Sequence, residues 1–75
     1  MTKQTQSFRT DRFLRIAPRR TDRVLEALRL LGNCSNKSAY DYSDEQVARI
    51  FRAIDAELRE TKSKFSRTAK KRFSL

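Results

Sequence analysis

The sequence predicts an all-α fold, an antiparallel helical hairpin formed by residues of about 22–31 and 44–70. Two observations lead to this prediction. Apolar side chains recur at helical spacing in both segments, and a complete helix-start signal stands at Ser43. The loop between the segments is short relative to the helices, so we expect the two apolar faces to cover each other.

Residues 1–20 precede the hairpin and are predicted as a basic arm that is either extended or a short helix. Arginines recur at every third position between residues 8 and 17, with apolar residues among them, and this run is too short to decide between the two conformations. Pro18 disfavours a helical backbone at Ala17, so we expect any structure here to stop before the next element.

The first helix of the hairpin is expected to open at Thr21 or Asp22 and to end at Leu31. Gly32 stands where a helix commonly ends in a left-handed residue. Leu30 points away from the apolar stripe, so either the N-terminal segment covers it or it belongs to an interface. The stripe itself has i, i+3, i+4 spacing and consists of Val24, Leu25, Leu28 and Leu31.

Residues 32–43 form the predicted loop, and the second helix follows it. The loop residues Asn33, Ser35, Asn36 and Ser38 favour local bends, because their side chains bond to nearby backbone groups.

Ser43 and Gln46 match a capping box, and Tyr42 and Val47 match a hydrophobic staple around it. The apolar stripe of the second helix comprises Val47, Ile50, Phe51, Ile54 and Leu58, and it continues more thinly through Phe65 and Ala69 toward Phe73. We expect Ile50 and Ile54 to face Leu25 and Leu28 in the hairpin.

Charge divides the chain into a basic N-terminal arm (1–20), a helical hairpin core (21–60) and a basic C-terminal helix extension (61–75). Basic side chains outnumber acidic ones six to one in the first part and six to none in the last, whereas the middle has six basic and eight acidic. Two basic ends around a near-neutral centre favour binding to a polyanion through phosphate contacts. The alternative interpretation is that basic ends merely keep a small protein soluble.

The candidate nucleic-acid-binding residues follow from this charge pattern. Phenylalanines among the arginines, and one loop tyrosine, are candidates for base stacking. For Phe13 the alternative is that it covers the helical core together with Leu14 and Ile16. The predicted phosphate ligands are Arg9, Arg12, Arg15, Arg19, Arg20, Arg49, Arg52, Arg59, Lys62, Arg67, Lys70 and Lys71, and the predicted stacking residues are Phe8, Phe13 and Tyr40.

Catalysis is not expected. The chain has no histidine, one cysteine and one glycine, so it lacks the usual general base, a metal-ligand set and a glycine-rich phosphate loop. We therefore expect no enzyme activity, no metal and no cofactor. The single Cys34 excludes an internal disulfide and favours a reducing compartment such as the cytoplasm.

Three functions are compatible with these features. The first is a small accessory subunit that grips a phosphate backbone in a nucleoprotein complex, with RNA slightly favoured because arginine outnumbers lysine twelve to six. The second is a protein–protein adaptor or oligomerising subunit that docks through its apolar faces, with Leu30, Phe65 and Phe73 near the contact. The third is a peripheral membrane helix, which we do not expect because bulky apolar residues are scarce beyond Leu58.

Overall fold

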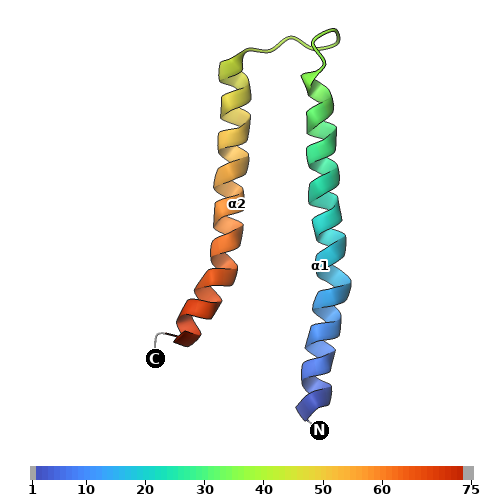
Figure 1. Cartoon of the computed structure of the whole chain (residues 1–75), viewed down its shortest axis with the longest axis vertical. Helices are drawn as coiled ribbons and strands as arrows, with labels where there is room; N and C mark the ends of the chain where they lie inside the picture. Colours follow the sequence, from blue (N-terminus) through green and yellow to red (C-terminus); the bar gives the residue numbers. More distant parts are fainter. Residues whose placement is uncertain (1, 74–75) are drawn as a thin grey trace. The chain divides into compact units, whose positions relative to one another are not determined.

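The computed structural model describes the backbone of residues 2–73 and the side chains of residues 8–66. Two long helices account for most of it: α1 spans Thr2–Gly32 and α2 spans Asp44–Phe73, and a short 3-10 turn, η1 (Asn33–Ser35), follows α1 (Figure 1). Residues 2–73 contain no strand. The all-α prediction with two helices is therefore confirmed. The chain consists of two units, residues 1–40 and residues 41–75.

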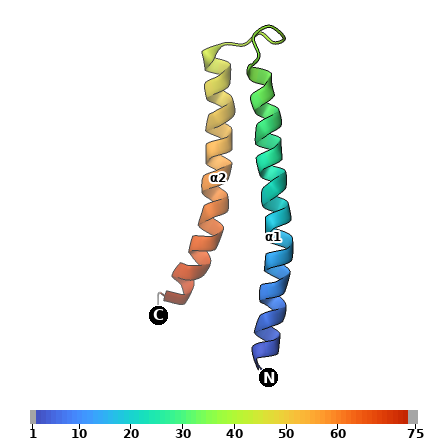
Figure 2. The ribbon, with the colours of Figure 1, turned by 45° about the vertical axis from the view of Figure 1, so that its right-hand side comes forward.

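Helix α1 continues through Pro18, so the predicted stop near Ala17 and the predicted helix start at Thr21 or Asp22 are wrong. The ribbon of α1 is unbroken in both views (Figure 1, Figure 2). Proline removes one backbone N–H, here the donor to the Leu14 carbonyl one turn earlier, and such a residue costs about 3 kcal/mol inside a helix. The helix-favouring residues on both sides outweigh that local cost. In the next turn, the Thr21 hydroxyl donates a hydrogen bond of 2.8 Å to the Ala17 carbonyl.

Gly32 does not end α1 in the left-handed conformation that the sequence predicts. Its φ of −59° and ψ of −29° are right-handed helical values, and none of the described residues has a positive φ. The helix tightens into η1 and ends where Asn36 becomes extended, with φ −69° and ψ 105°. Termination therefore comes from the residues after Gly32, and not from the special freedom of glycine.

The bend after η1 is built by Asn36, as the sequence predicts. Its side-chain oxygen accepts hydrogen bonds from the Ser38 backbone N–H at 3.1 Å and from the Ser38 hydroxyl at 2.6 Å. Its carbonyl accepts from the backbone N–H groups of Ala39 at 3.1 Å and Tyr40 at 2.9 Å. These bonds are local, which is why residue types alone were sufficient to predict the bend.

Helix α2 begins with the predicted capping box. The Gln46 backbone N–H donates to the Ser43 hydroxyl at 3.1 Å, and the Ser43 backbone N–H donates to the Gln46 side-chain oxygen at 2.8 Å. Two backbone donors that the first turn leaves without a helical partner are thus satisfied. Tyr42 and Val47, the two residues of the expected staple, are both partly buried.

The apolar stripes of both helices are exposed to solvent. No side chain among residues 8–66 is buried, and Leu28 and Ile50 are still 40% and 41% exposed. Each helix alone offers only one apolar side, so covering it requires a second element. The expected packing of Leu25 and Leu28 against Ile50 and Ile54 concerns two separate units and stays a prediction.

Candidate nucleic-acid interface

Continuity of α1 through Pro18 places four arginines on one side of the helix. Their spacings of three, four and four residues keep them within a sector of about 80° at about 100° per residue. Because α1 rises about 1.5 Å per residue, they cover about 16 Å of its length. We call this set the arginine stripe; its members are Arg12, Arg15, Arg19 and Arg23.

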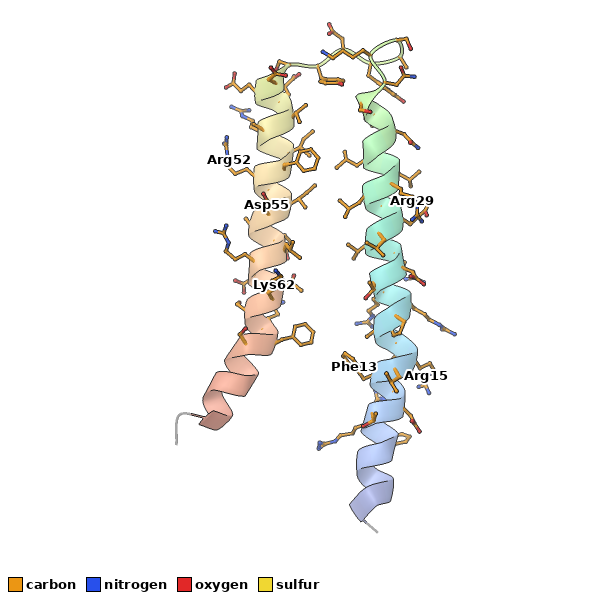
Figure 3. The ribbon with its side chains drawn as sticks, in the orientation of Figure 1. Phe13, Arg15, Arg29, Arg52, Asp55 and Lys62 are labelled. Atoms are coloured by element: carbon orange, nitrogen blue, oxygen red, sulfur yellow. The ribbon has the colours of Figure 1, made fainter. Side chains whose placement is uncertain are left out.

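The arginine stripe lies on the side of α1 opposite the apolar stripe of Val24, Leu25, Leu28 and Leu31. Phe13 and Arg15 accordingly leave α1 in opposite directions (Figure 3). Packing of the apolar stripe against another element would therefore leave the arginine stripe in solvent.

The guanidinium groups of the arginine stripe are available for an external anion. All four arginines are exposed, and within residues 8–66 Arg15, Arg19 and Arg23 take part in no ion pair. By contrast, Arg29 in the last turn of α1 is paired with Glu26. The charge of α1 is thus concentrated in its N-terminal half, where residues 8–23 hold six arginines and two aspartates.

Arg9 and Arg20 are also predicted phosphate ligands, and both lie outside the arginine stripe. Arg9 lies at its edge. Arg20 lies next to the apolar stripe, nearly a right angle away from the arginine stripe. Both are exposed.

Phe8 belongs to the arginine side of α1. Its ring is 5.9 Å from the Arg12 guanidinium carbon, measured to the ring centroid, and the residue is 64% exposed. That distance is at the outer limit of a cation–π contact. Phe13, predicted as a second stacking residue, falls at the border of the apolar stripe, which favours its alternative role of covering the core.

Tyr40, the third predicted stacking residue, lies beyond the far end of α1 from Phe8. It follows the Asn36 bend and is 53% exposed. Because α1 continues for nine residues beyond Arg23 to Gly32, Tyr40 is not brought together with the arginine stripe.

Helix α2 offers a weaker basic surface. Its side opposite the apolar stripe carries three arginines, Arg49, Arg52 and Arg59, and two acids, Glu45 and Glu60, whereas the sector of the arginine stripe on α1 carries four arginines and one acid, Glu26, which is paired with Arg29. Lys62 borders the apolar stripe instead, and in Figure 3 it leaves α2 in a different direction from Arg52. The side chains of the remaining predicted ligands, Arg67, Lys70 and Lys71, and that of Phe73, lie outside the described residues.

Arg23 is the residue that sequence reasoning missed. If a separate helix began at Thr21 or Asp22, the direction in which Arg23 leaves its helix would be unrelated to the directions of Arg12, Arg15 and Arg19. The available signal was the regular three- and four-residue spacing of arginines across Pro18.

Comparison with protein-family models, with curated proteins and with solved structures finds no match to this chain. Within the described part of the chain, His, Cys, Asp and Glu side chains form no group of three that would hold a metal ion. Over the same residues, neither helix carries an apolar stretch long enough to cross a membrane.

Proposed function

We propose that this protein is a small, non-catalytic nucleic-acid-binding accessory subunit that grips the phosphate backbone of RNA or DNA with α1. The observation that carries this proposal is the arginine stripe, four exposed guanidinium groups in register on one side of a helix. Arginine presents a planar fork of donors that matches phosphate oxygens, and arginines outnumber lysines in the chain, which favours RNA slightly.

Counterion release is the expected driving force. Each phosphate that an arginine neutralises frees condensed cations from the nucleic acid, so affinity falls steeply as salt rises. Contacts of this kind fix the position of a protein on the backbone without selecting a sequence. The protein is therefore expected to bind many sequences with similar affinity, as a subunit of a larger nucleoprotein complex in the cytoplasm. The free thiol of Cys34 is compatible with that compartment.

The antiparallel hairpin is part of this proposal. It would cover the apolar stripes of α1 and α2 with each other and leave the arginine stripe outside. It also brings the basic half of α1 and the basic end of α2 to the same end of the hairpin.

A matched pair of triple variants tests the phosphate contacts. Replacement of Arg15, Arg19 and Arg23 by glutamine removes three charges from the arginine stripe. The control replaces Arg49, Arg52 and Arg59 by glutamine and removes the same charge from α2. Binding to single-stranded and duplex RNA is measured by fluorescence anisotropy at several salt concentrations.

The α1 triple variant is expected to lower the magnitude of the salt slope by about 2–3, since each phosphate that is no longer neutralised removes roughly 0.7–0.9 from it. The α2 control is expected to change the slope by less than the amount for a single phosphate. Equal changes of the salt slope in the two triple variants would show that binding depends on net charge and not on the arginine stripe. Absence of salt-dependent binding by the unmodified protein would refute the function itself.

The second candidate function is a helical protein–protein adaptor, or an oligomerising subunit that docks through its apolar faces. The observation that favours it is Leu30, which is 58% exposed on α1 and points away from the apolar stripe, so a hairpin built on the two stripes would not cover it. Sedimentation at high salt tests this function, because salt weakens nucleic-acid bridging and leaves apolar contacts. A monomer at high protein concentration would exclude self-association.

A further inference from the structure

Phe8 is an exposed aromatic residue that the apolar stripe of α1 does not explain. It lies on the arginine side of the helix, about half a turn away from the direction of Val24 and Leu28. The other phenylalanines with described side chains are placed differently: Phe51 and Phe65 lie in the apolar stripe of α2, and Phe13 borders that of α1. Burial of either stripe would therefore leave Phe8 in solvent.

The surroundings of Phe8 are cationic. The Arg12 guanidinium lies near the ring, 5.9 Å from its centroid, and the remaining arginines of the stripe continue along α1 from that point. Because Phe8 is 64% exposed, its ring remains accessible to a flat ligand. An aromatic ring beside a row of phosphate-binding cations is the combination that single-stranded nucleic acids require, because every base has a face that stacks.

We infer that Phe8, flanked by Arg12, is a stacking site for an unpaired nucleobase, so that the arginine stripe binds single strands in preference to duplexes. A paired base keeps both of its faces inside the duplex stack and offers none to Phe8. A single strand presents both the base for Phe8 and the phosphates for the arginines that follow it. This inference rests on the proposed function, and it adds the substrate class.

Three substitutions at Phe8 separate stacking from simple apolar contact. Phe8→Leu keeps the apolar volume and removes the ring, Phe8→Ala removes both, and Phe8→Trp keeps a ring. The chain contains no tryptophan, so Phe8→Trp also introduces a single fluorescent probe. Binding is measured for an oligouridylate, an oligothymidylate and an RNA duplex with the same number of phosphates, and far-UV circular dichroism verifies that each variant stays helical.

Phe8→Leu and Phe8→Ala are expected to weaken binding to the single strands by about five- to 150-fold, the range for removal of one base–aromatic stack, with no change in the salt slope and little change for the duplex. Phe8→Trp should retain the affinity, and its fluorescence should be quenched by the single strands and not by the duplex.

Two results would overturn the inference. One is an unchanged single-strand affinity for Phe8→Leu and Phe8→Ala, and the other is an equal loss of affinity for single strands and duplex. In both cases a normal salt slope of the unmodified protein would leave the phosphate-binding function standing. A protein that binds neither ligand would instead refute both.

Discussion

Replacement of Gly32 by alanine is expected to stabilise the protein, because Gly32 is an ordinary helical residue in this structure. Its φ and ψ of −59° and −29° are accessible to alanine without strain, and a Cβ atom added at this position would have no neighbouring atom within 4 Å. Alanine also reduces the conformational freedom of the unfolded chain. The expected gain is about 0.5–1 kcal/mol, which corresponds to roughly 2–8 °C in Tm for a domain of this size.

Whether alanine raises or lowers the stability distinguishes a right-handed Gly32 from a left-handed one at the end of α1. A left-handed Gly32, as the sequence predicts, would make alanine unfavourable by about 1–2 kcal/mol. Thermal unfolding followed by far-UV circular dichroism measures the difference. Ala27→Gly is the control, because it makes the reverse change at an exposed interior position of α1 and should cost about 1 kcal/mol. A lower Tm for Gly32→Ala would refute the right-handed geometry, provided that the control shows its expected decrease in stability.

Three further substitutions test the helices. Ser43→Ala removes the hydroxyl that accepts from the Gln46 N–H and should cost about 0.5–2 kcal/mol, whereas an unchanged free energy of unfolding in urea would mean that the capping box contributes nothing. Pro18→Ala restores a backbone donor inside α1 and should raise helicity and stability by about 1–3 kcal/mol; a decrease in helicity would contradict a helix that continues through this residue. Ile54→Ala should cost about 2–4 kcal/mol if the hairpin buries Ile54, and a change below about half a kcal/mol would show that this stripe is not packed.

The sequence was sufficient for features that depend on hydrogen bonds between residues two or three apart. The capping box at Ser43 was predictable because its two hydrogen bonds join residues three apart. The bend at Asn36 was predictable for the same reason, since the Ser38 donors are two residues away. The basic character of the N-terminal half of α1 also follows from composition alone.

The two wrong predictions, a helix stop before Pro18 and a left-handed Gly32, have a common cause. The backbone conformation that one residue type prefers is overridden by the conformation of the residues around it. Pro18 disfavours a helix locally, and Gly32 tolerates a left-handed backbone, but neither preference exceeds a few kcal/mol. Helix formation is cooperative, so favourable residues on both sides of such a position decide its conformation.

Only the structure shows which side chains far apart in the sequence lie on the same side of a helix. Each helical residue turns the chain by about 100°, so a break at Pro18 would have left Arg12 and Arg15 unrelated to Arg19 and Arg23. Because α1 is continuous, these arginines share one side with Phe8, while Phe13 is directed toward the apolar stripe. The spacing of apolar residues therefore determined that this protein is helical, its composition determined that it is basic, and the unbroken helix determined which of its charges and rings share one side.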